Sequence, residues 1–257
     1  MAIYVVSDVH GAADELSGAV PEGSTLLLLG DLINFIDYLS MTGILVDVFS
    51  AEAVSRVVRL RTEGRFEEAR EAMRARAEGH EDEIQQELGR RVREQYDKVF
   101  AALRDDTYLI LGNVDNPALA RTYMEAHGGI HDADGKAFEI GGQRFGFVGG
   151  ALPTPLHVAG EVTEEQMRAS IGALGEVDVL CSHIPPAVPE LCFDTVARRA
   201  ERGSRDLLEY LLDVKPVRHY FGHVHQPLVS SMYVGETLCI NAGHFRKTAR
   251  AFLHRVG

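Results

Sequence analysis

The chain has 257 residues, of which 46% are hydrophobic and 25% charged, as in globular proteins that bury a substantial core. Its net charge of -12 at pH 7 disfavours binding to long nucleic acids, because neutralising their phosphates requires basic surface. No apolar run approaches the roughly 18 residues that span a bilayer, and the N-terminal "MAIYVVSDVH" lacks the basic segment of a signal peptide. We therefore expect a cytoplasmic protein with no membrane partner, whose three cysteines are reduced and buried.

Short apolar runs recur along the chain, and most of them end in a turn-forming or polar residue. The first strands are expected at residues 3–6, at residues 26–29 and in "TYLILGNVD". A β-hairpin turning at Gly141-Gly142 is expected in "AFEIGGQRFGFVGG", and three more strands in "VDVLCSHIPP", "RHYFGHVHQP" and "ETLCINAGH". Runs of four or five apolar residues are typical of strands covered on both faces, as in layered α/β sheets.

Helical patterns separate some of these strands. Residues 163–174 begin with Thr163 and have Gln166 three positions later, which is the arrangement of a capping box. Residues 195–213 carry apolar side chains at helical spacing, with Gly203 in the middle. We predict a helix over each range.

The segment from about residue 45 to 104 differs from the rest of the chain. Between residues 50 and 104 it holds 12 Lys/Arg and 12 Asp/Glu, and its apolar residues recur at helical spacing. We predict a charged insertion of two or three long amphipathic helices, hinged near Gly64 and Gly79, in an otherwise single domain over residues 1–257. A solvated hairpin covering one edge is the simplest interpretation; a cap over the active site and a homodimer contact are the alternatives.

Polar side chains directly follow five of the expected strands. They are Asp8, His10, Asp31, Asn113, His183, His223 and His225. Because α/β sheets bind ligands at the carboxyl ends of their strands, we expect these side chains to lie together. Seven oxygen and nitrogen donors suit two metal ions about 3.5–4 Å apart that share a carboxylate. Imidazole, carboxylate and amide ligands suit Mn, Fe, Zn, Co or Ni, and the lack of thiolates argues against a structural zinc site.

At these motifs the chain resembles the calcineurin-like metallophosphoesterases. The stretches "SDVHG", "LGDL", "LGNVD", "CSHIPP" and "FGHVHQP" follow the family's order DxH, GD, GN, H and GHxH. The resemblance covers nearly the whole length except the charged insertion. It implies an α/β fold, a four-layer α-β-β-α sandwich of two facing mixed β-sheets. It also implies that one metal ion is held by Asp8, His10 and His225, the other by Asn113, His183 and His223, with Asp31 as the bridge.

The resemblance further implies a function. Two divalent transition-metal ions, Mn²⁺ first with Fe or Zn as alternatives, would supply a bridging hydroxide that hydrolyses a small phosphoester. Many family members have a histidine after the Asn of the third motif, which can protonate the leaving oxygen, but this chain has Val114 there. An ester with a good leaving group needs less help from an acid, so a phosphodiester such as a cyclic nucleotide is the first expectation. A phosphomonoesterase acting on a nucleotide or sugar phosphate, and a metal-containing scaffold without activity, are the alternatives.

Other polar residues are candidates for the remaining roles. Asp115 and His244 are expected to be catalytic, and His244, in "NAGHFR", is the first candidate to replace the missing acid because the analogous loop of relatives lies beside the metal site. Asn34 and His157 are expected to contact the substrate. The remaining histidines are expected to be surface or structural residues, namely His80, His127, His131, His219 and His254.

Overall fold

The computed structural model describes residues 2–154 and 158–255. The chain divides into two compact units. The first unit comprises Met1–Leu32 and Val99–Gly257, and the second comprises Ile33–Lys98. The second unit therefore begins earlier along the chain than the insertion predicted from about residue 45.

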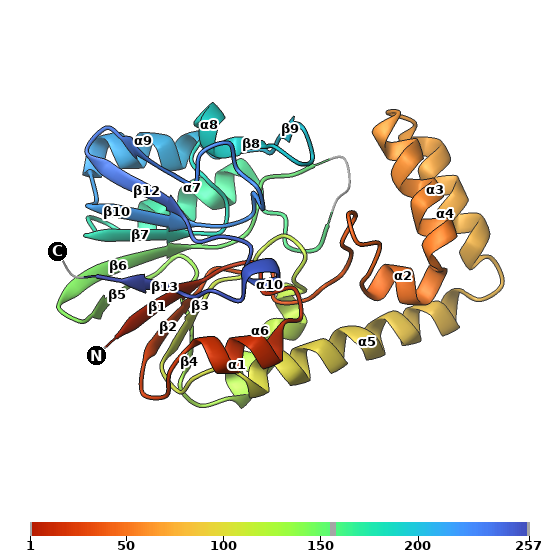
Figure 1. Cartoon of the computed structure of the whole chain (residues 1–257), viewed down its shortest axis with the longest axis horizontal. Helices are drawn as coiled ribbons and strands as arrows, with labels where there is room; N and C mark the ends of the chain where they lie inside the picture. Colours follow the sequence, from red (N-terminus) through yellow and green to blue (C-terminus); the bar gives the residue numbers. More distant parts are fainter. Residues whose placement is uncertain (1, 155–157, 256–257) are drawn as a thin grey trace. The chain divides into compact units, whose positions relative to one another are not determined.

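Two mixed β-sheets form the centre of the first unit (Figure 1). The first sheet has the order β13-β1-β2-β3-β4 and consists of β1 (Ile3–Val6), β2 (Thr25–Leu28), β3 (Thr107–Leu109), β4 (Ile130–Asp132) and β13 (Phe252–His254). The second has the order β11-β12-β10-β7-β6-β5 and consists of β5 (Ala137–Ile140), β6 (Gln143–Val148), β7 (Val179–Ser182), β10 (Arg218–Phe221), β11 (Ser231–Val234) and β12 (Thr237–Asn241). The inner strands of each sheet are parallel, and β13, β5 and β11 are antiparallel edge strands.

The sheets face one another across an apolar core. Val5 and Leu27 of the first sheet pack with Phe147, Cys181 and Tyr220 of the second. The alternate residues of the second sheet point the other way and pack under two helices, α7 (Glu164–Ala173) and α9 (Arg205–Val214). Helices α1 (Ala13–Ala19) and α6 (Pro117–Ala126) flank the first sheet (Figure 1). The predicted layered α/β sandwich is thus confirmed, and both faces of the short apolar strands are covered as expected.

Local predictions around the second sheet were confirmed except in one segment. The β5–β6 hairpin turns at Gly141 and Gly142, and α7 has the predicted capping box. The helix predicted over 195–213 is wrong in its first half. A short α8 (Pro189–Cys192) is followed by a two-stranded hairpin of β8 (Phe193–Asp194) and β9 (Arg199–Ala200). The helix α9 begins only after Ser204, whose side chain caps it by accepting a hydrogen bond from the Leu207 N–H.

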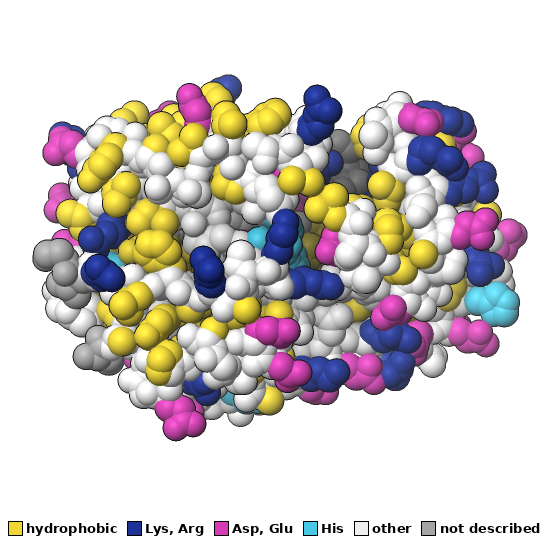
Figure 2. Space-filling model, viewed as in Figure 1, with side chains coloured by type: hydrophobic (Ala, Val, Ile, Leu, Met, Phe, Trp, Pro, Cys, Tyr) yellow, Lys and Arg dark blue, Asp and Glu magenta, His cyan; other side chains and the backbone are white. Residues whose placement is uncertain are grey.

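The second unit is helical. It contains α2 (Ile44–Phe49), α3 (Ala51–Thr62), α4 (Phe66–Ala77) and the start of α5 (Glu81–Ala101), which continues past Lys98. The predicted breaks at Gly64 and Gly79 are confirmed, and both glycines have a positive φ. Basic and acidic side chains are interspersed over these helices (Figure 2). Within the described residues, none of the helices combines the length and apolar character that crossing a membrane demands.

Candidate metal centre

The seven predicted ligands lie where parallel strands of the two sheets end. β1, β2 and β3 lead into Asp8, Asp31 and Asn113, whereas β7 and β10 lead into His183 and His223. The carboxyl ends of these strands meet at one edge of the sandwich, as α/β ligand sites do. The sheet topology therefore brings together residues that are far apart in the chain.

Several ligand residues have a left-handed backbone, which is uncommon for residues other than glycine. The φ angles are 58° for Asp8, 43° for His10, 55° for Asp31 and 67° for His223. Each such conformation costs on the order of 1–3 kcal/mol and persists only where the surroundings impose it, most often at functional sites. Here the surroundings include backbone hydrogen bonds: the His10 N–H donates to Asp31 O at 2.9 Å, and the Asp8 N–H donates to Gly30 O at 3.1 Å.

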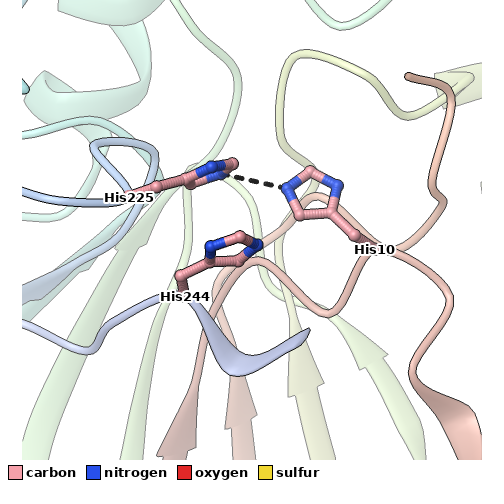
Figure 3. A group of neighbouring side chains, drawn as sticks. All are labelled: His10, His225 and His244. Carbon is pink, nitrogen blue, oxygen red and sulfur yellow. Dashed lines mark hydrogen bonds between the residues drawn. The ribbon is translucent and has the colours of Figure 1, made fainter. Parts of the chain in front are cut away.

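Asp8, His10, Asp31 and His225 form the first group of candidate ligands, and their donor atoms all lie within 4.8 Å of one another. His10 Nε2 lies 3.1 Å from His225 Nε2 (Figure 3) and 3.8 Å from Asp31 Oδ2. Asp8 Oδ1 lies 3.4 Å from His225 Nε2. Tetrahedral ligands about 2.0–2.1 Å from an ion are about 3.4 Å apart, so these donor atoms fit one ion.

The second group consists of Asp31, His183 and His223, whose donor atoms also lie within 4.8 Å of one another. His183 Nε2 lies 3.6 Å from Asp31 Oδ1. Asn113 joins this group through its side-chain oxygen, which lies 3.2 Å from His183 Nε2 and 3.0 Å from His223 Nδ1. These separations fit a second ion.

Asp31 belongs to both groups through different oxygens. Its Oδ2 faces His10 of the first group, and its Oδ1 faces His183 of the second. This is the arrangement of a carboxylate that bridges two ions, and the mixed imidazole, carboxylate and amide donors fit divalent transition metals. The two groups divide the seven residues in the same way as the resemblance implies.

Two glycines allow the ligands to approach this closely. A Cβ atom at Gly112 would lie 2.1 Å from Asp31 Oδ1 and 2.6 Å from His183 Cε1. A Cβ atom at Gly222 would lie 2.4 Å from Asp8 Oδ2. Any side chain at either position would therefore push a candidate ligand away, which accounts for the glycines that precede Asn113 and His223.

A backbone carbonyl fixes the orientation of His183. The His183 Nδ1–H donates to Leu29 O at 2.7 Å, which leaves the lone pair on Nε2 for an ion. The neighbouring Ser182 hydroxyl donates to Ile184 O at 2.6 Å and accepts a hydrogen bond from His219 Nε2 at 2.7 Å. His219 is completely buried, which agrees with the structural role expected of it.

The charges of the first group influence one another. Burial raises the pKa of Asp8, but hydrogen bonding and the charge of His225 outweigh it and leave the pKa well below its usual range. Burial lowers the pKa of His225, but the Asp8 carboxylate outweighs it and leaves the pKa raised. In the second group, burial and the neighbouring His183 lower the pKa of His223 to about 4. Asp8 is thus ionised and His223 neutral near pH 7, the states in which they bind metal.

Asp115, which the sequence predicts to be catalytic, is bound by backbone groups of two loops. Its side chain is completely buried and accepts hydrogen bonds from three backbone N–H groups. Gly112 and Asp31 donate to Oδ2 at 2.9 Å, and Leu32 donates to Oδ1 at 3.0 Å. Burial and the negative charge of Asp31 raise the pKa of Asp115 to about 7, although the hydrogen bonds from the N–H groups act to lower it. Asp115 therefore ties the loop after β3 to the loop after β2, and its catalytic role stays a prediction.

His244 lies beside the first group, as Figure 3 shows. Its ring stacks on that of His225, with centroids 3.9 Å apart and an interplanar angle of 17°. It meets the His10 ring edge-on, with centroids 5.6 Å apart. The structure therefore brings this candidate to the centre. The backbone N–H of Val114 donates to Asp31 Oδ1 at 3.1 Å.

Of the two predicted substrate-binding residues, one belongs to the second unit and the other is outside the described residues. Asn34 belongs to the second unit, where its N–H donates to Gln95 Oε1 at 2.6 Å and its carbonyl accepts from the Ile44 N–H at 3.0 Å. Its contact with a substrate stays a prediction. His157 lies within residues 155–157, which the structure does not describe.

Comparisons with known proteins support the fold. No protein-family model matches the chain, and no curated protein matches it. One solved crystal structure has 15% sequence identity and a TM-score of 0.59, and the match covers 99% of each chain. The crystal structure of TT1561 from Thermus thermophilus has 12% identity and a TM-score of 0.53, with 98% of this chain and 97% of that chain covered. At these identities the similarity shows the fold alone, and it extends over the whole chain.

Proposed function

We propose that this protein is a dinuclear metal-dependent phosphoesterase that hydrolyses a small phosphodiester. The observation that carries the proposal is the division of seven donors into two groups that share Asp31 through its two oxygens. When bound, two divalent ions in such a site polarise phosphoryl oxygens and lower the pKa of a water molecule so that hydroxide is present near neutral pH.

The protein's own contribution is to hold charge and geometry in place. Asp8 and Asp31 are almost completely buried, so their negative charges are available only to groups inside the centre. The loop that carries Asn113 is fastened by Asp115 and by the hydrogen bond from the Gly160 N–H to Asn113 O at 3.0 Å. Ligands held in this way need little rearrangement when an ion binds, which favours affinity and catalysis.

Position 114 narrows the range of substrates. A valine side chain has no proton to give to a leaving oxygen, so the leaving group must depart largely unassisted at this position. Weakly basic leaving groups are favoured, as in aryl esters, whereas the ribose alkoxide that leaves from a cyclic nucleotide would have to take its proton from another group. The hydrolysis of alkyl phosphomonoesters is expected to be slower.

A turnover assay tests the proposal. Protein loaded with Mn²⁺ is given bis-p-nitrophenyl phosphate, p-nitrophenyl phosphate, and 2′,3′- and 3′,5′-cyclic nucleotides. We expect diester turnover to exceed monoester turnover. Asp31→Ala should lose both ions and all turnover because it removes the shared ligand, whereas Asp14→Ala, an exposed aspartate of α1, should retain both. Monoester rates far above diester rates would contradict the diesterase assignment, and two bound ions without turnover would favour a scaffold.

A further inference from the structure

We propose that His244 is an additional ligand of the ion held by Asp8, His10, Asp31 and His225. This inference rests on the proposed dinuclear centre and assigns His244 to one of its two ions. His10, His225 and His244 each offer a ring nitrogen, and the three nitrogens lie within 4.8 Å of one another. Figure 3 shows the three rings together, with His244 beside the rings of His225 and His10.

The His10 and His225 nitrogens already suit a shared ion. Nitrogens bound to one ion at about 2.0–2.1 Å cannot lie more than about 4.2 Å apart, and the Nε2 atoms of His10 and His225 are 3.1 Å apart. The His244 ring lies nearly parallel to that of His225, so it must rotate out of this stack to direct a nitrogen at the same ion.

The backbone holds His244 beside the first group. His244 precedes the short helix α10 (Phe245–Thr248), whose first two N–H groups donate to the strand end that carries Asp8. The Phe245 N–H donates to Ser7 O, and the Arg246 N–H donates to Asp8 O, both at 3.1 Å. The Arg246 guanidinium also donates to His10 O at 3.1 Å. The turn carrying His244 is therefore fastened directly to the segment carrying two ligands of the first group.

A His244 nitrogen that binds an ion cannot also act as an acid. An imidazole nitrogen that gives its lone pair to an ion cannot hold a proton at that atom. His244 would then not replace the acid missing at Val114, and the preference for good leaving groups would be strict. A third imidazole also makes the first group better suited to Zn²⁺, Co²⁺ or Fe²⁺ than to Mg²⁺ or Ca²⁺.

Metal affinity and a Co²⁺ spectrum test the assignment independently of turnover. The variants are His244→Ala and His244→Gln, and the glutamine keeps a side-chain oxygen that can bind a metal ion. His80→Ala, in the exposed turn that precedes α5, is the control. Chelator competition measures the dissociation constant of each ion. We expect the first-site constant to rise at least about 10-fold in His244→Ala and less in His244→Gln, with the second-site constant unchanged. The visible Co²⁺ absorption should also change in His244→Ala but not in His80→Ala.

The results that would overturn this inference differ from those that would overturn the proposed function. Unchanged affinity and an unchanged Co²⁺ spectrum in both His244 variants would overturn the inference, whether or not turnover fell. If His244→Ala does not fold, as judged by circular dichroism, the comparison of wild type with His244→Gln decides. A wild-type protein that binds no ion would overturn both proposals. One that binds two ions but hydrolyses none of the esters would overturn the proposed function alone.

Discussion

In the helical unit Ile33–Lys98 charged side chains lie at the surface, whereas in the unit with the two sheets several charged side chains are buried where strands end. Arg90 pairs with Glu87 and Glu94 along α5, and the arginine is about half exposed. Asp8, Asp31 and Asp115, in contrast, are at most 3% exposed. A solvated ion pair has little effect on the free energy of folding, but a buried carboxylate costs several kcal/mol unless specific partners compensate.

This contrast indicates the buried charges of the sheet unit as the functional site. The helical unit has more charged residues for its length, yet many of its ion pairs join exposed side chains three or four positions apart. In the sheet unit the partners of the buried carboxylates come from distant parts of the chain. The proposed metal ions would compensate the cost of burying these carboxylates.

The largest effect on stability is expected from Asp115→Ala. The substitution leaves the N–H groups of Gly112, Asp31 and Leu32 buried without their acceptor. At about 1–3 kcal/mol for each lost acceptor, the free energy of unfolding should fall by at least about 3 kcal/mol. Urea unfolding of metal-free protein measures this change.

Asp115→Asn and a metal titration separate positioning from stability alone. Asn retains one acceptor oxygen, so it should restore part of the lost stability and part of the metal affinity lost in Asp115→Ala. If Asp115→Ala bound both ions as tightly as wild type, Asp115 would not position the ligands. Wild-type stability in Asp115→Ala would contradict the hydrogen-bond argument itself.

Sequence patterns predicted which polar residues lie together, because residue type and strand ends both leave local signals. The role of Asp115 was not predictable in this way, because its three donors belong to two loops that only the folded sheet brings together. Edge strands β4 and β13 were missed for a related reason. Each has only three residues, too few for a periodic pattern, so their pairing with β3 and β1 depends on distant neighbours. The helix at 195–213 failed because helical spacing cannot reveal the β8–β9 hairpin.

An effect of intermediate size on the pH dependence of stability is expected from His219. Burial lowers the pKa of this histidine to about 3, below the value of about 6.5 in an unfolded chain. Between these two pKa values the unfolded state binds a proton that the folded state does not bind. The contribution of His219 to stability is therefore complete above about pH 6.5 and falls as the pH decreases toward 3. Between pH 7 and pH 5 the loss from this group should be about 2 kcal/mol.

His219→Gln tests this linkage. The variant should lose stability at pH 7, since the hydrogen bond to Ser182 changes, but its further loss between pH 7 and pH 5 should be about 2 kcal/mol smaller than that of wild type. Urea unfolding of metal-free protein at the two pH values measures both quantities. The exposed His80→Gln should keep the wild-type dependence. An identical pH dependence in His219→Gln and wild type would refute the burial argument.

The smallest effect is expected from Arg90→Ala in the helical unit. Arg90 Nε lies 2.7 Å from Glu87 Oε2, but both side chains are solvated, so water replaces the pair at little cost. The urea midpoint should not change measurably. Arg104→Ala is the matched arginine of the sheet unit. Its guanidinium donates to Val20 O at 2.9 Å from a partly buried position, and its loss should cost roughly 1.5 kcal/mol. If the two arginine variants changed the stability equally, the stability would not depend on whether a charged side chain is solvated or partly buried.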